Sequence, residues 1–242
     1  MGNVNVYNLR GKGNVFHLCE FLGSMLLVIA SISPVILFYE ILKTDIALAV
    51  LADAIAVGFI LFALIEIFSP VCTAFFNPVV TIALAIDGKL TWKQAGIYSA
   101  NQILGGLTGL LISQLMFYDK IPKLLVISNI ARSGGDFVAE ILGTFVLVLA
   151  IFSLVEQKSN KTSLVVGFLV GGMILATSST MFANPQVTIA RMFTYSAAGI
   201  APLDGLIFIA MQIIGAVLAI LAWRSMRLTC FDYRYEKARK DS

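Results

Sequence analysis

Six long apolar stretches are the feature that most limits what this chain can fold into. They lie at about 16–39, 46–68, 91–115, 137–156, 162–181 and 203–223. A helix that crosses a bilayer needs about 20 apolar residues, so each stretch is long enough for one crossing. The chain is 59% hydrophobic and 13% charged, whereas a soluble domain is usually about 45–50% apolar and about 25% charged. The sequence therefore predicts an all-α membrane protein that forms one domain over residues 1–242.

Two shorter apolar segments begin with Asn-Pro and are too short to cross. They lie at about 77–87 and 184–196 and carry the octets NPVVTIAL and NPQVTIAR. Asn is a favoured N-cap, and Pro is favoured at the first helical position. Asn77-Pro78 and Asn184-Pro185 therefore predict the starts of two short re-entrant helices. Irregular backbone at membrane depth is tolerated only where protein or a water-filled cavity covers it.

The chain is also a tandem repeat. CEFLGSMLLV at Cys19 matches AEILGTFVLV at Ala139, and NQILGG at Asn101 matches MQIIGA at Met211. The two halves span about 16–115 and 137–223, with three spans each. Because three is odd, the halves lie in opposite orientations, and inverted repeats place the functional site near the midplane. We expect the Asn-Pro helices to meet there, with amide N–H groups of Asn77 and Asn184 facing a solute oxygen and helix dipoles opposing cations.

Basic residues indicate how the chain is oriented. They gather in the N-terminal segment, in two connections and in the tail: Arg10, Lys12, Lys89, Lys93, Lys158, Lys161, Arg224, Arg227, Arg234, Lys237, Arg239 and Lys240. With six spans these all fall on one side, which the positive-inside rule makes cytoplasmic. The third connection breaks this trend with Lys120, Lys123 and Arg132. The sequence still favours cytoplasmic termini and the plasma membrane.

Several function classes are excluded by what the sequence lacks. No basic run with interleaved aromatics points to nucleic acid. The cysteines, Cys19, Cys72 and Cys230, do not form a disulfide framework and are expected to be ordinary buried thiols. The one histidine, His17, has no nucleophile–base set or metal cluster around it. We therefore expect no enzyme activity, no cofactor and no metal.

Together these motifs resemble the aquaporin and aquaglyceroporin (major intrinsic protein) family of channels for water and small solutes. The resemblance covers about residues 16–223. It implies a bundle of six tilted helices plus two half-helices, assembled as a homotetramer in the lipid bilayer with a pore in each subunit. It also implies that Glu20 and Glu140 hold the backbones of the two Asn-Pro loops. A carboxylate inside a span has to be paired or hydrogen-bonded, which agrees with that role.

The family's selectivity constriction is placed by counting from the Asn residues. The count assigns it to Val57, Gly172, Met181 and Val187. Val187 stands where water and glycerol channels usually carry arginine, so the chain resembles a microbial branch of the family with Val there. These four residues would form a wide, apolar ring with no fixed charge.

Arg191 lies four residues after Val187, and Asp53 lies four before Val57. Four residues turn a helix by about 400°, so both belong one turn further out. We expect Arg191 and Asp53 to line an outer vestibule, where the two could pair. Two other placements of Arg191 remain open, namely a structural ion pair outside the pore or a position among lipid headgroups.

These features predict a passive channel for small neutral solutes. The solutes expected are glycerol-like polyols, urea and metalloid hydroxides such as arsenous acid, with water as a further one. A water-selective channel, an ion-coupled secondary transporter and a non-transporting structural protein remain as alternatives. A transporter would need a titratable group at the midplane site, and the carboxylates of this chain map elsewhere.

Overall fold

The computed structural model describes residues 13–240, with side chains over 15–227, and these described residues form helices and no strand. The helices are α1 (Gly13–Val35), continued by a π-helical turn (Ile36–Ile41), α2 (Ile46–Phe68), α3 (Pro78–Ile86), α4 (Trp92–Leu115), α5 (Gly134–Glu156), α6 (Thr162–Ala176), α7 (Pro185–Arg191) and α8 (Pro202–Lys240). Six of these are long. Two, α3 and α7, are short and begin at the Asn-Pro motifs.

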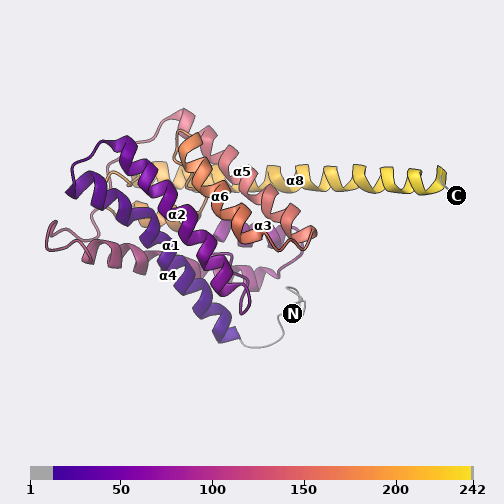
Figure 1. Ribbon diagram of the computed structural model, residues 1–242, viewed down its shortest axis with the longest axis horizontal. Coiled ribbons are helices and arrows are strands. Elements are labelled where there is room, and N and C mark those ends of the chain that lie inside the picture. Colours follow the sequence, from indigo (N-terminus) through magenta and orange to yellow (C-terminus); the bar gives the residue numbers. More distant parts are fainter. Residues whose placement is uncertain (1–12, 241–242) are drawn as a thin grey trace.

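The long helices pack in pairs that follow the repeat. In the first half α1 lies against α4, and in the second half α5 lies against α8 in the same way. The pair of α2 and α6 joins the two halves. The short helices α3 and α7 both contact α4 and α8 and meet each other inside the bundle. Helix α1 begins, and α8 ends, at the end of the bundle opposite to the α1–α2 loop (Figure 1).

The described residues form a multi-pass helical membrane bundle. Four helices are long and apolar enough to cross a membrane: Val15–Ile41, Ile46–Phe68, Gly134–Glu156 and Pro202–Arg227. Helix α4 is long enough but less apolar, because it carries polar side chains that the fold buries, including Gln102, Ser113 and Gln114.

Helix α6 is shorter than predicted. It ends at Ala176 rather than about 181, because residues 177–183 leave the helix to form the loop that leads to α7.

The last helix is longer than predicted. Helix α8 continues to Lys240, whereas the apolar run ends at about 223 (Figure 1). The residues beyond that run, such as Arg224 and Arg227, are good helix formers, and they keep the helix going after the apolar stretch has ended. Both arginines make ion pairs at this end of the bundle, Arg224 with Asp87 and Arg227 with Glu156.

Candidate functional site

Two buried glutamates hold the loops that precede the half-helices. Glu20 accepts hydrogen bonds from the Thr73 hydroxyl (2.7 Å), from the backbone N–H groups of Phe75 (2.9 Å) and Phe76 (2.8 Å), and from the Gln102 amide (2.7 Å). All four lone-pair sites of this carboxylate are therefore used. An orphaned buried donor costs about 1–3 kcal/mol, so Glu20 is the group that allows this loop to lie inside the bundle.

The second half repeats the arrangement. Glu140 accepts from the Ser179 hydroxyl (2.7 Å), the N–H groups of Phe182 (2.8 Å) and Ala183 (2.9 Å), and the Gln212 amide (2.7 Å). Both carboxylates are fully buried. The matching sets of donors explain why the same Glu and Gln recur in the two halves of the sequence.

The loops themselves have strained backbone. Ala74 and Phe76 in the first loop and Met181 and Ala183 in the second have positive φ angles of 50°, 48°, 37° and 42°. Non-glycine residues stay in this region only where surrounding contacts over-determine them. The glutamate hydrogen bonds to the neighbouring N–H groups supply such contacts.

The glycine of each Glu-x-x-Gly motif makes room for a loop side chain. A Cβ added to Gly23 would lie 2.0 Å from the Phe76 ring, and one added to Gly143 would lie 2.8 Å from Cγ of Met181. The motif therefore has two parts with separate tasks: the glutamate bonds the loop backbone, and the glycine accommodates a loop side chain.

The Asn-Pro motifs cap the two half-helices and join them. Asn77 Oδ1 accepts from the N–H of Val79 (3.0 Å), and Asn184 Oδ1 accepts from the N–H of Gln186 (3.2 Å). Each Asn amide also donates to the carbonyl that precedes the other Asn, Asn77 to Ala183 (2.8 Å) and Asn184 to Phe76 (2.9 Å). One N–H of each amide remains for a solute, because an amide NH₂ carries two donors.

Gln186 is a contact that sequence reasoning missed. Its amide donates to the Phe76 carbonyl at 2.6 Å and adds a further link between the two loops. The signal in the sequence was its place as the third residue of the octet, where the first copy has Val79.

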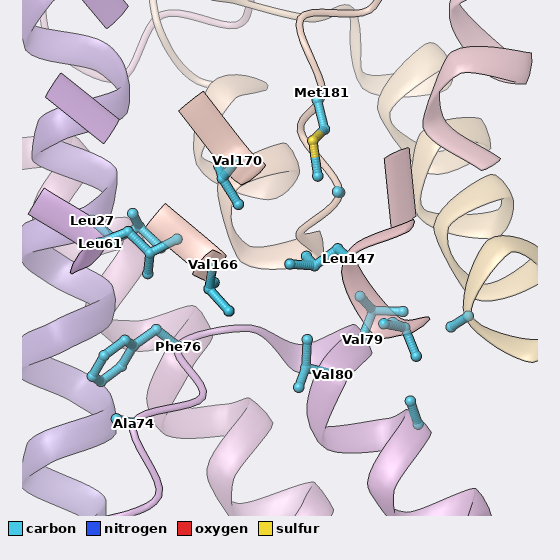
Figure 2. Close-up of a cluster of buried hydrophobic side chains, with 14 of the residues drawn as sticks. Leu27, Leu61, Ala74, Phe76, Val79, Val80, Leu147, Val166, Val170 and Met181 are labelled. Carbon is cyan, nitrogen blue, oxygen red and sulfur yellow. The ribbon is translucent and has the colours of Figure 1, made fainter. Parts of the chain in front are cut away.

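A cavity of about 390 Å³ runs past both Asn residues. Its wall is mostly apolar and comes from α1, α2, α5 and α6: Leu27, Val57, Leu61, Ile65, Leu147, Ile151, Val155, Val166, Val170 and Ile174. In Figure 2 Leu147, Val166 and Val170 point into the space between these helices, with Phe76 and Val80 below them. Loop residues Thr73–Asn77 and Thr180–Asn184 also line the cavity.

The two ends of this cavity are polar. At one end Glu66 and Ser163, which are hydrogen-bonded to each other, lie with Ser159 and Asn160. At the other end lies Arg191. Between these ends the polar lining side chains are the two Asn amides, a few hydroxyl groups and the thiol of Cys72, and the rest of the wall is apolar.

Three of the four residues assigned to the constriction line this cavity, and the fourth does not. Val57, Met181 and Val187 are buried and lie in its wall. The assignment of Gly172 is wrong, because this residue lies in a separate apolar groove on the outside of α2 and α6, with Ile55 among its neighbours.

The orientation of α6 explains the error. Gly167 and Gly171 face α2: their added Cβ atoms would lie 2.7 Å from the Gly58 carbonyl and 2.9 Å from the Ala54 carbonyl. Residues four apart share one face of a helix. Val166, Val170 and Ile174 therefore face the cavity, and Gly172 is turned away from it.

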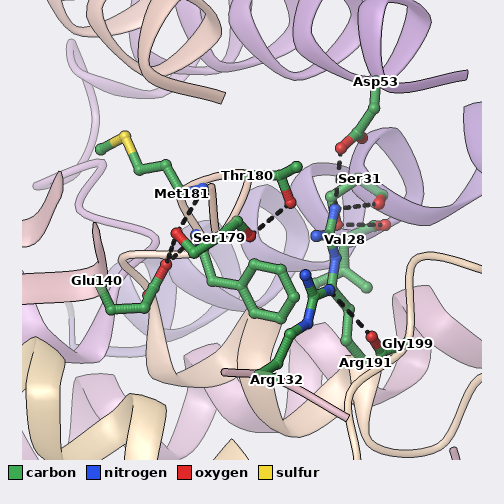
Figure 3. A network of polar contacts seen from close by, with 11 residues as sticks. Val28, Ser31, Asp53, Arg132, Glu140, Ser179, Thr180, Met181, Arg191 and Gly199 are labelled. Carbon is green, nitrogen blue, oxygen red and sulfur yellow. Dashed lines mark hydrogen bonds and ion pairs between the residues drawn. The ribbon is translucent and has the colours of Figure 1, made fainter. Parts of the chain in front are cut away.

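Arg191 and Asp53 form a buried ion pair beside the cavity. Nη2 of Arg191 lies 3.0 Å from Oδ2 of Asp53, and each side chain is 4% exposed. The same nitrogen donates to the Ser31 carbonyl at 2.6 Å (Figure 3). Arg191 lines the cavity and Asp53 does not, so the expectation that Asp53 also lines the vestibule is wrong. The structure thus brings together two of the placements that the sequence left open, since the ion pair exists and its arginine faces the cavity.

Comparison with known proteins gives the same architecture. The family model described as Major intrinsic protein matches residues 15–182. The aquaglyceroporin AqpS of Rhizobium meliloti (strain 1021) is 34% identical over 206 residues, which cover 84% of this chain and 87% of that protein. The glycerol uptake facilitator protein of Bacillus subtilis (strain 168) is 35% identical over 109 residues, 40% of each chain. The X-ray structure of the aquaglyceroporin from Plasmodium falciparum has a TM-score of 0.70 at 19% identity, covers 90% of this chain and 98% of that chain, and shares the fold.

Proposed function

This chain belongs to the major intrinsic protein family, and on that premise we propose that it is a passive channel for small neutral solutes. The solutes are glycerol-like polyols, urea and metalloid hydroxides such as arsenous acid, and water passes as well. The names of two relatives, an aquaglyceroporin and a glycerol uptake facilitator, support solutes of the glycerol class.

One observation carries the proposal, namely a cavity that passes both Asn-Pro tips through an apolar layer. Val57, Met181 and Val187 all line it. No charged side chain stands at Val187, so the layer lowers the cost of entry for weakly hydrated solutes. An apolar wall also penalises water by dewetting. These properties favour neutral solutes with hydrocarbon parts over a water-selective pore.

Exclusion of cations is assigned to the meeting point of α3 and α7. Each half-helix points its positive end toward the other, because each begins at its Asn near the centre of the bundle. Asn77 and Asn184 line the cavity there and have an N–H left for a solute oxygen. A hydroxyl can accept these N–H groups, whereas a cation is repelled by the same dipoles.

The assembly proposed is a homotetramer in the cell membrane with both termini in the cytoplasm. Support comes from the resemblance to the family and from the basic residues of the tail and of the connections that hold Lys89 and Lys158. On this orientation Glu66 lies at the cytoplasmic mouth of the cavity and Arg191 toward the outer mouth.

Stopped-flow light scattering on proteoliposomes tests the function, with water, glycerol, urea and arsenous acid as solutes. We expect non-saturating flux that needs no ion gradient. Val187→Arg should change the relative fluxes of water, glycerol, urea and arsenous acid severalfold, because a hydrated charge then replaces an apolar surface in this layer. Val187→Ala is the size control and should keep solute flux. Saturating, ion-dependent flux would point to a transporter instead, and an unchanged solute profile in Val187→Arg would contradict the placement of the constriction.

A further inference from the structure

Arg191 is a fixed cation in the wall of the cavity. It lies one turn along α7 from Val187, and both residues line the same space. Its guanidinium is held from three elements: the Ser31 carbonyl of α1 at 2.6 Å, Asp53 of α2 at 3.0 Å and the ring of Phe182 at 4.3 Å. A side chain held at so many points cannot swing out of the way of a solute.

The charge of this cation is compensated inside the protein. Asp53 is buried and does not line the cavity, so the pair is neutral while only the arginine meets a solute. Arg132 is the other cation near Phe182, at 5.2 Å from its ring. Arg132 does not line the cavity, and Asp136 and Asp204 lie near it. Arg191 is therefore the cation that a passing solute meets at this level.

Part of the hydrogen-bonding capacity of the pair is unused. Both hydrogen bonds that Arg191 makes with described residues come from Nη2, so Nη1 makes none with them. Nε of Arg191 and Oδ1 of Asp53 are buried and also have no partner among the described residues. A guanidinium has five N–H donors, and a buried donor that has no acceptor costs free energy. A solute oxygen at Nη1 would use one of them.

We propose that Arg191 and Asp53 form a charge-compensated filter, set one turn outward from the apolar layer, that selects small neutral polyhydroxy solutes. The filter rests on the proposed channel function and names the residues that give its selectivity. A solute must cross an apolar layer at Val187 and then a layer that donates hydrogen bonds at Arg191. Polyols suit both layers, because they have hydrocarbon faces and hydroxyl oxygens. Ions gain nothing, because the pair has no net charge to attract either sign.

The experiment measures glycerol, chloride and potassium flux in proteoliposomes. Asp53→Asn leaves the charge of Arg191 uncompensated, and chloride flux should rise by roughly tenfold or more, because a one-sign lining concentrates counter-ions. Arg191→Met leaves Asp53 buried without its partner, so this carboxyl takes up a proton and becomes neutral. Potassium flux should then stay at the wild-type level, because the positive helix ends at Asn77 and Asn184 still oppose cations. The double variant Asp53→Asn/Arg191→Met removes both charges, so ion flux should return to the wild-type level. Its glycerol flux should fall about fivefold or more, because a glycerol hydroxyl then has no Arg191 N–H group to accept from.

Asp45→Asn is the matched control. Asp45 caps the same helix, accepting from the Leu48 N–H at 2.8 Å, and does not line the cavity. Asn caps a helix as well as Asp does, so glycerol and ion flux should not change. Size-exclusion profiles and melting curves show which variants fold. If a single variant does not fold, the double variant decides, and wild-type glycerol flux in it would overturn the filter. An Asp53→Asn variant that folds and passes no chloride would overturn it too. If the wild type showed no glycerol flux, the proposed channel function itself would be refuted.

Discussion

Cys72 has a role in the folded chain that its sequence context does not predict. Its sequence context is that of an ordinary buried thiol, and its side chain is indeed only 8% exposed. The small exposed part, however, lies in the wall of the cavity, near the end that holds Glu66. A thiol in that position is open to small neutral reagents that enter the channel.

A thiol-reactive reagent should therefore block the channel through Cys72. Benzyl methanethiosulfonate is expected to lower glycerol flux severalfold in the wild type, because the added ring occupies the cavity. Cys72→Ser should abolish the block. Cys19→Ser serves as the comparison, since Cys19 is buried but does not line the cavity. The measurement is stopped-flow flux before and after treatment, and a block that survives in Cys72→Ser would contradict the position of this side chain.

Single residues also mark the limit of sequence reasoning. The Glu-x-x-Gly repeat pointed to Glu20 and Glu140 as hydrogen-bonded carboxylates, because an unpaired charge inside a span is costly. The partner of Arg191 could not be fixed in the same way. Asp53 lies 138 residues earlier in the chain, and only the folding of the whole bundle brings the two side chains together.

Local capping residues decide where these helices begin, whereas tertiary packing decides which face of a helix meets the cavity. The half-helices start directly after Asn77 and Asn184 because each Asn caps its own first turn, and that signal is local. No local signal shows which face of α6 meets the cavity. That face is set by tertiary packing, because Gly167 and Gly171 allow α6 to pack closely against α2. Counting residues back from Asn184 could not detect this, so Gly172 lies outside the cavity, whereas Met181 and Val187, close to the motif, line it.

Substitutions on α6 test this orientation. Gly172→Leu should leave glycerol flux unchanged, because a Cβ there meets no atom within 4 Å and the residue faces the outer groove. Val170→Phe, two residues away, should lower flux severalfold because it fills the cavity. Flux and melting temperature are measured together, so that misfolding is separated from blockage. A block by Gly172→Leu in a folded protein would restore the assignment that the structure rejects.

The whole molecule carries its charge unevenly, and this gives a test of its orientation. Lysines at the two ends of the bundle are exposed, for example Lys123 in the α4–α5 connection and Lys158 in the α5–α6 connection. Most predicted cytoplasmic charge lies at the end where α8 leaves the bundle.

The sequence was sufficient to predict the number of long helices and the repeat, because hydropathy and motif order are properties of the chain itself.

Cysteine labelling of whole cells checks the orientation. In a background with Cys72→Ser and Cys230→Ser, Lys123→Cys should react with a membrane-impermeant maleimide from outside, because its connection is expected to be external. Lys158→Cys should react only after the cells are opened. Both positions are exposed loop lysines, so they differ mainly in the side of the membrane. The reverse pattern would contradict cytoplasmic termini.

The crossed hydrogen bonds between the two Asn residues have a consequence for biosynthesis. Asn77 donates to a carbonyl 106 residues later in the chain, and Asn184 returns a bond to Phe76. While the ribosome is still making the second half, the first loop has neither its donor nor its acceptor partner, and its strained backbone lies at membrane depth. The first half therefore cannot complete its own pore loop when it is inserted. The crossed bonds can form only after the loop that leads to α7 has been made, so the first half of the chain alone is not half a pore.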